Sequence, residues 1–271
     1  MTILIDSSDG VRVGLHDLGG NGPPLLLLHA TGFHGRCYRA IADHLGDHFH
    51  IWAPDLRGHG DSVTPADTDL GWASMANDVL AVSEYLGVDS WAVAGHSMGG
   101  AVAAKTAYLY PQLIAAAWVF EPVIFPVNTA NRGNSLAESA RLRRHHFDSF
   151  EEAIERYASA APFAQVSRDV ISDYVTHGFV ETDTGVTLKT PGETEARVFE
   201  GVDLELFEQI RSVSVPFTIA NSLDGSPPSQ IAELVAEQLP NTRRIIWPDN
   251  THLGPFENPR RAATEILAAV G

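Results

Sequence analysis

Short apolar runs alternate with longer stretches of helical periodicity in the first half of the chain. Leu25-Leu26-Leu27-Leu28 has no polar residue between its leucines, which is typical of a strand buried on both faces of a parallel sheet. Between residues 72 and 86 the apolar positions recur at a spacing near 3.6, which predicts a helix. The Ala-rich run Gly99–Tyr110 predicts another helix, which Pro111 ends. Further strands are expected at residues 50–53, 91–94 and 113–120. This alternation predicts βαβ units in an α/β protein with a doubly wound, mostly parallel sheet.

The N-terminal segment predicts a hairpin, and the βα pattern is interrupted once further along the chain. Val11–His16 follows the turn-forming pair Asp9-Gly10 and predicts one arm of an N-terminal hairpin. The βα pattern then stops after Pro126 and returns with a strand at Pro216–Ala220. Helices are expected at residues 230–238 and 259–270, with a strand at 243–247.

Between these two regions, residues 136–147, 149–160 and 168–177 predict three short helices with polar faces, and residues 182–185 predict a turn. We therefore expect a core of residues 1–126 and 213–271, and a helical cap inserted at residues 127–212 that lies over the sheet. The alternative is an ordinary peripheral subdomain with no role in binding.

Composition narrows the class of protein. The chain has 271 residues, a length that many α/β folds use as one unit, and 44% of its residues are apolar while 19% are charged, which excludes a disordered chain. Cys37 is the only cysteine, so a disulfide scaffold is excluded.

Charge and hydropathy argue against two kinds of partner. The formal net charge of −16 is unfavourable for binding nucleic acid or an anionic membrane surface. The apolar run at residues 113–120 is far shorter than the roughly 20 residues of a membrane span. The first ten residues lack the basic and long apolar regions of a secretory signal. We expect a cytoplasmic protein without nucleic-acid or membrane partners, and the oligomeric state stays open.

The strongest chemical signal is Gly95-His96-Ser97-Met98-Gly99, a G-x-S-x-G segment between a predicted buried strand and an Ala-rich helix. A serine raised on a sharp strand-to-helix turn needs small residues two positions before and two after it, and Gly95 and Gly99 meet that need. This context predicts that Ser97 is a nucleophile, whereas the alternative is a tight structural turn with a buried serine.

Together with three further segments, this motif resembles the α/β-hydrolase fold superfamily over nearly the whole chain. Members commonly carry H-G-x-x-G, D-x-R-G-x-G-x-S and G-H segments at these places. This chain departs from those patterns at two places. Ala30 stands where the first segment commonly has glycine, and Asn250-Thr251 stand where the third commonly has the glycine before its histidine. The matching segments here are His29–Gly32, Asp55–Ser62 and Asn250–Pro255. The resemblance implies a serine hydrolase, and the serine excludes the dehalogenase and epoxide hydrolase branches, which use aspartate as the nucleophile.

A serine hydroxyl needs a base, and the base needs a carboxylate that fixes its tautomer. His252 follows the last predicted strand, and the order serine, acid, histidine is the one this fold uses. For the acid, Glu121 directly ends a buried strand, where a carboxylate is costly unless it is paired, and some haloalkane dehalogenases and a fungal zearalenone lactonase place their acid there. Asp224 lies beyond the next strand, where the family most often keeps its acid. We favour Glu121, with Asp224 as the alternative; an Asp-Gly turn is the structural interpretation of Asp224.

The resemblance also implies an oxyanion hole and a substrate pocket. The backbone N–H groups of Met98 and Thr31 are the expected donors to the oxyanion, with Gly32 as the alternative to Thr31. We expect Phe33, His34, Tyr38 and Phe125 to contact substrate, although aromatic residues in such places are often core. Arg57, Asp55 and Asp61 are expected to form a structural ion-paired loop.

These observations predict a cofactor-free serine hydrolase acting on a small-molecule carboxylic ester or lactone. No HExxH, paired CxxC or EF-hand loop occurs, and the glycines at residues 19–22 precede a strand, so we expect neither a metal nor a bound dinucleotide. The alternatives are a C–C bond hydrolase or a perhydrolase that uses the same residues, or a small-molecule receptor with little turnover.

Overall fold

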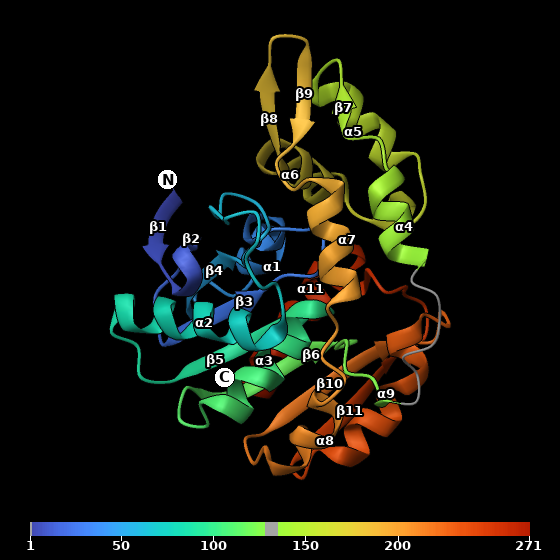
Figure 1. The fold of residues 1–271 in the computed structure, drawn as a ribbon. Helices are drawn as coiled ribbons and strands as arrows, with labels where there is room; N and C mark the ends of the chain where they lie inside the picture. Colours follow the sequence, from blue (N-terminus) through green and yellow to red (C-terminus); the bar gives the residue numbers. More distant parts are fainter. Residues whose placement is uncertain (1, 128–134) are drawn as a thin grey trace.

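A computed structural model describes residues 2–127 and 135–271 of the chain. Its centre is an eight-stranded sheet in the order β1-β2-β4-β3-β5-β6-β10-β11 (Figure 1). The pairs β1/β2 and β2/β4 are antiparallel, and the remaining pairs are parallel. The predicted doubly wound, mostly parallel sheet is therefore confirmed. The strands are β1 Thr2–Asp6, β2 Arg12–Gly19, β3 Pro24–Leu28, β4 His50–Asp55, β5 Trp91–His96, β6 Ile114–Phe120, β10 Phe217–Ser222 and β11 Thr242–Trp247.

Helices cover both faces of this sheet, as its apolar strands require. α2, α3 and α9 pack on one face, and α1 and α11 pack on the other. Alternation along β3 serves both faces, because Leu26 and Leu28 join the core on the first face while Leu25 and Leu27 join the core on the second. The helices are α1 Arg39–Ala42, α2 Trp72–Leu86, α3 Met98–Leu109, α8 Leu206–Gln209, α9 Pro227–Gln238, α10 Gly254–Glu257 and α11 Pro259–Val270.

Between β6 and β10, the elements from α4 to α7 form a separate layer, at the top of Figure 1. The helices expected at residues 149–160 and 168–177 correspond to α5 and α6. The helix expected at 136–147 is shorter, because α4 ends before a small three-stranded sheet in the order β7-β9-β8. The predicted turn at residues 182–185 joins β8 and β9 in an antiparallel hairpin. The elements are α4 Ser135–Leu142, β7 His146–Phe147, α5 Phe150–Ala158, α6 Arg168–Gly178, β8 Phe179–Thr182, β9 Gly185–Leu188 and α7 Gly192–Glu200.

Aromatic side chains join this layer to the core. The ring of Phe33, in the loop after β3, lies 5.2 Å from the Tyr174 ring of α6 and 5.8 Å from the Phe163 ring, measured between centroids. It also lies 4.9 Å from the Phe256 ring of α10. Rings at these separations contribute about 0.5–1.5 kcal/mol per pair beyond the area they bury. Among the described residues, no helix is both long and apolar enough to cross a membrane.

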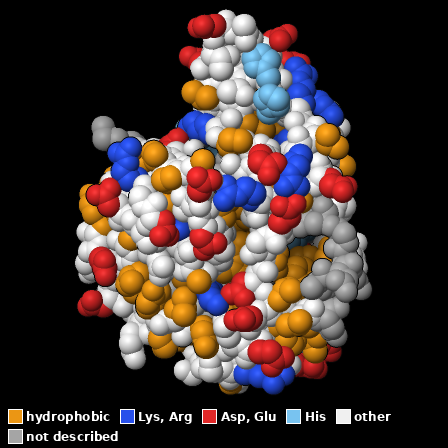
Figure 2. All heavy atoms as spheres, in the orientation of Figure 1, with side chains coloured by type: hydrophobic (Ala, Val, Ile, Leu, Met, Phe, Trp, Pro, Cys, Tyr) orange, Lys and Arg blue, Asp and Glu red, His pale blue; other side chains and the backbone are white. Residues whose placement is uncertain are grey.

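Surface charges on the view in Figure 2 are interspersed and form no large patch of one sign. Arg141 on α4, for example, pairs with both Glu193 and Glu200 of α7. Such exposed pairs contribute little to stability individually.

Candidate active site

The turn that carries Ser97 is sterically determined. Ser97 joins β5 to α3 with φ 55° and ψ −114°, a conformation that costs energy for any residue other than glycine. A Cβ atom on Gly95 would lie 2.6 Å from the Gly99 carbonyl oxygen, and a Cβ on Gly99 would lie 2.1 Å from the Leu28 oxygen. Both flanking positions must therefore be glycine, because the start of α3 presses against the strand and against the end of β3.

His252 lies between Ser97 and a carboxylate. Its Nε2 atom is 3.0 Å from Ser97 Oγ, and its Nδ1 atom is 2.5 Å from Glu121 Oε2. Since a carboxylate accepts, Nδ1 carries the proton and Nε2 is free to accept from the serine hydroxyl. Ser97, Glu121 and His252 are far apart in the sequence. They meet because the strands before them, β5, β6 and β11, end at the same edge of the sheet.

Glu121 is fully buried and enclosed by donors. It follows β6 with a positive φ of 45°. Its Oε1 accepts from the backbone N–H of Ser222 at 2.8 Å and from the Ser222 hydroxyl at 2.6 Å, and its Oε2 also accepts from the Ser226 hydroxyl at 2.8 Å. Burial acts to raise the pKa of this carboxyl, but His252 and the two serines outweigh it and hold the pKa below its usual value. Glu121 is therefore ionised and fixed in orientation.

Asp224 contacts the main chain of the same histidine. Its Oδ2 accepts from the backbone N–H of His252 at 2.8 Å, while Oδ1 accepts from the Ser226 backbone N–H at 2.8 Å. No contact between Asp224 and the imidazole ring is present in the described part of the chain. Of the two candidate acids, the structure brings Glu121 to the ring and Asp224 to the backbone.

The expected oxyanion donors have free N–H groups. Within residues 2–127 and 135–271, neither the Met98 nor the Thr31 backbone N–H donates to another protein group. Met98 begins α3, and the loop with Thr31 follows the β3 carbonyls against which Gly99 packs. Gly32, the next residue, has a φ of +79°. Unpaired N–H groups at the start of a helix and in a neighbouring loop are typical donors in a site that stabilises an anion.

His96 and Tyr38 connect the two loops of the site. His96 is buried, and burial holds its pKa well below the usual value, so its ring is neutral. Its Nε2 lies 2.8 Å from the His252 carbonyl oxygen and its Nδ1 lies 3.1 Å from the Tyr38 hydroxyl. That hydroxyl in turn accepts from the Ala30 N–H at 3.3 Å. One chain of hydrogen bonds therefore runs from Ala30, in the loop after β3, to the loop that carries His252.

The four residues expected to contact substrate occupy different environments. His34 is buried, with Nε2 3.1 Å from the Tyr174 carbonyl oxygen, and Tyr38 is buried in the chain just described. Phe33 faces the aromatic residues of the insertion, and Phe125 is partly exposed after β6. Of these four, Phe33, His34 and Tyr38 are buried, and Phe125 is the one with a partly exposed side chain.

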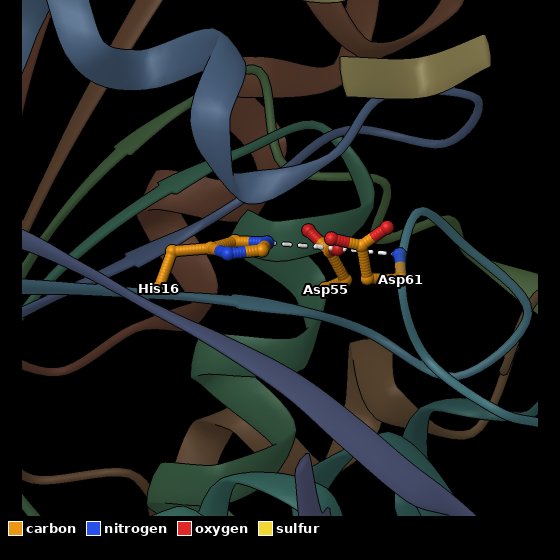
Figure 3. A group of neighbouring side chains, drawn as sticks. All are labelled: His16, Asp55 and Asp61. Atoms are coloured by element: carbon orange, nitrogen blue, oxygen red, sulfur yellow. Dashed lines mark hydrogen bonds and ion pairs between the residues drawn. The ribbon is translucent and has the colours of Figure 1, made fainter. Parts of the chain in front are cut away.

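Among the described residues, His16, Asp55 and Asp61 resemble a metal site, because their ligand atoms lie within 4.8 Å of one another (Figure 3). Asp55 Oδ2 already accepts from His16 Nε2 at 2.9 Å and from the Asp61 N–H at 2.7 Å. Asp55 Oδ1 accepts from the Gly35 N–H at 2.7 Å, and Lys189 donates to Asp61 at 2.5 Å. The oxygens that a cation needs are occupied by donors, so this donor set fits an ion-paired structural loop better than a metal site.

Two contributions to the site were not expected from the sequence. Ser222 and Ser226, which hold Glu121, lie on either side of Asp224, in the segment where the resemblance places the acid, and that position was the available signal. Arg143, just after α4, donates to Glu195 of α7 at 2.6 Å, beside the oxyanion loop. A single arginine among many surface charges gives no comparable signal.

Comparison with known proteins supports the same fold. The chain is 36% identical over 97 residues to an uncharacterised protein of Mycobacterium tuberculosis, which is 36% of this chain and 28% of that protein. The matched part thus spans less than a third of such relatives. It is 25% identical to the pimeloyl-[acyl-carrier protein] methyl ester esterase of Yersinia enterocolitica over 90% of this chain and 91% of that one.

Among solved structures, E-2-(acetamidomethylene)succinate hydrolase superposes with a TM-score of 0.85 at 20% identity, covering 100% of this chain and 98% of that one. The family model described as alpha/beta hydrolase fold matches residues 23–181. Taken with the parallel sheet and the serine at its strand–helix turn, this match places the chain in the α/β-hydrolase fold family.

Proposed function

We propose that this protein is a cofactor-free serine hydrolase that cleaves a carboxylic ester or lactone. The observation that carries the proposal is the continuous contact from Ser97 Oγ to His252 Nε2 at 3.0 Å and from His252 Nδ1 to Glu121 at 2.5 Å. A nucleophile, a base and an orienting acid within hydrogen-bond reach are the requirements for acyl transfer. The full-length relative from Yersinia is a methyl ester esterase, which supports the ester class.

In the proposed reaction, Ser97 Oγ attacks the acyl carbon while His252 Nε2 takes the hydroxyl proton. The carbonyl oxygen becomes an oxyanion that accepts from the Met98 and Thr31 N–H groups. His252 then gives its proton to the leaving alkoxide, and an acyl-enzyme remains. Water, deprotonated by the same nitrogen, attacks the acyl carbon, and the proton returns to Ser97 as the carboxylic acid leaves.

The other two groups have supporting roles. Glu121 holds the imidazole in the required tautomer and stabilises the imidazolium. Asp224 positions the main chain of His252, and residues 127–212 act as a cap that shapes the acyl site. A small-molecule ester is therefore the substrate class that we propose.

The test is hydrolysis of p-nitrophenyl acetate by the wild type and by Ser97→Ala. Loss of the nucleophile is expected to lower kcat by about 10⁶-fold. Ser212→Ala is a matched control, because this serine is exposed and its hydroxyl only donates to the Gln209 carbonyl. A burst of p-nitrophenol equal to the enzyme concentration would support the acyl-enzyme. Undiminished turnover by Ser97→Ala would refute the proposal.

A further inference from the structure

Arg143 is bonded to three separate helices of the layer above the sheet. Its Nη1 donates to Glu195 Oε2 of α7 at 2.6 Å. Its Nη2 donates to the hydroxyls of Tyr157 on α5 at 2.7 Å and Tyr174 on α6 at 2.6 Å. The guanidinium is largely buried, with only 19% of its side chain exposed, and the Glu195 side chain is 9% exposed. Taking two charges out of water is costly, and their attraction offsets that cost only with good geometry and further hydrogen bonds, as the two tyrosines provide here.

The pair lies directly on the oxyanion loop. A Cβ atom on Gly32 would be 2.5 Å from Glu195 Oε1 and 3.7 Å from Arg143 Nη1. Gly32 is adjacent to Thr31, whose backbone N–H is a proposed oxyanion donor. The next residue, Phe33, contacts the ring of Tyr174, which itself accepts from Arg143. The charged pair thus contacts the residue next to Thr31, whose N–H is a proposed donor to the oxygen of the reacting carbonyl.

Both members of the pair keep unused hydrogen-bonding capacity. A guanidinium has five N–H donors, and Arg143 uses three of them in the contacts above. Its Nε has no partner in the described part of the chain, and neither has Glu195 Oε1. Neither atom is among the fully buried unpartnered atoms of the described residues, so each keeps some exposed surface. The pair therefore presents a donor and an acceptor beside the oxyanion loop.

Charge balance limits what this pair can bind. Arg143 and Glu195 neutralise each other, so a substrate carboxylate would meet the Glu195 carboxylate, and a substrate ammonium would meet the guanidinium. A hydroxyl or amide can donate to Glu195 Oε1 and accept from Arg143 without adding a buried charge.

We propose that Arg143 and Glu195 form a polar subsite that recognises an uncharged hydroxyl or amide group close to the scissile carbonyl of the substrate. This inference rests on the proposed ester hydrolysis and specifies its substrate class. The subsite acts on specificity, because it contacts a substituent and leaves the reacting atoms to Ser97, His252 and the oxyanion donors.

The test compares kcat/KM for methyl butyrate, racemic methyl 3-hydroxybutyrate and monomethyl succinate, followed by acid release at constant pH. The wild type is expected to favour the hydroxy ester over methyl butyrate by about 10- to 100-fold, as for a hydrogen bond to a charged group. Arg143→Met is expected to abolish that preference, so that kcat/KM falls further for the hydroxy ester than for methyl butyrate. Glu195→Gln, which retains an acceptor, is expected to retain part of the preference.

Arg141→Met is the matched control, because Arg141 lies on α4 and pairs with Glu193 and Glu200 at the surface. It should leave the ratio of the two esters unchanged. Melting temperatures establish that each variant is folded, and Arg143→Lys, which keeps the charge but loses the planar fork, replaces Arg143→Met if the latter does not fold.

Two results would overturn the subsite. Equal losses for all three esters in folded Arg143→Met would show that the pair only fastens the layer above the sheet. Monomethyl succinate as the best ester would show that the site takes a carboxylate. Calorimetric binding to Ser97→Ala separates this inference from the proposed function. The subsite would be supported, even without wild-type turnover, if Ser97→Ala bound the hydroxy ester more tightly than methyl butyrate and the double variant with Arg143→Met lost that difference. Equal binding of the two esters by Ser97→Ala would refute it.

Discussion

Asp224 Oδ2 lies 2.8 Å from the backbone nitrogen of His252, so the second carboxylate of the site holds the histidine by its main chain. The ring is held by Glu121 instead, 2.5 Å from Nδ1. Ser222 stands between them, with its hydroxyl oxygen 2.6 Å from Glu121 and 2.8 Å from Asp224. Two acids thus act on the same residue through different atoms, and substitutions can separate their roles.

Glu121→Gln is expected to lower kcat for p-nitrophenyl acetate by about 10³- to 10⁴-fold, because an amide at this place favours the wrong imidazole tautomer. Asp224→Asn keeps an acceptor for the His252 N–H, and we expect a loss of about tenfold or less. Both are measured at pH 8 under saturating substrate. If Asp224→Asn were the more damaging change, the assignment of the two acids would have to be reversed.

Tyr38→Phe removes the link between the Ala30 N–H and His96. The change leaves a buried N–H and a buried ring nitrogen without partners, so the free energy of unfolding should fall by about 1–3 kcal/mol. We expect kcat to fall while KM stays constant, because Tyr38 is enclosed on both sides by protein. Urea denaturation and steady-state kinetics on one ester provide the two measurements. A rise in KM alone would instead support the sequence-based expectation that Tyr38 contacts substrate.

Gly99→Ala is expected to destabilise the fold by several kcal/mol, or to prevent folding, because its Cβ would overlap the Leu28 carbonyl at 2.1 Å. Gly46→Ala is the matched control, since the nearest atom to its Cβ would be 3.7 Å away. Thermal melts of the two variants should differ clearly, with Gly46→Ala close to wild type. Equal melting temperatures would show that the start of α3 can move away from β3.

Stability should fall as the pH drops from about 6.5 toward 5. Burial is the main cause that lowers the pKa of four histidines inside the core, and it lowers that of His29 to about 3. Below about pH 6.5 the unfolded chain takes up protons that the folded chain refuses, so each such histidine costs about 1.4 kcal/mol per pH unit. The four are His29, His34, His59 and His96.

Urea midpoints at pH 7.5, 6.0 and 5.0 measure this slope. Replacing one of the four histidines, as in His59→Gln, should flatten the slope, because one proton fewer is taken up on unfolding. A midpoint that stays constant over this range would show that these rings are protonated in the folded protein.

The core of the fold could be predicted because its signals are local. The inner parallel strands β3 and β5 are mostly apolar on both faces, and α2 keeps a helical spacing over its whole length. The small sheet of the insertion was missed because β7, β8 and β9 are short and half exposed, so their residues show no clear alternation. Their pairing depends on contacts across the insertion, such as His146 with Thr187, which no local pattern reveals.

The sequence alone determined where the proposed nucleophile lies, because the turn at Ser97 needs glycine on both sides and a strand and a helix at its ends. It could not decide between Glu121 and Asp224, since both follow strands at the same sheet edge. Only the tertiary structure shows which of the two carboxylates contacts the imidazole ring. β6 and β10 are neighbours, with Phe120 opposite Ala220, and the positive φ of Glu121 turns its carboxylate to the imidazole while Asp224, two residues beyond β10, reaches only the main chain.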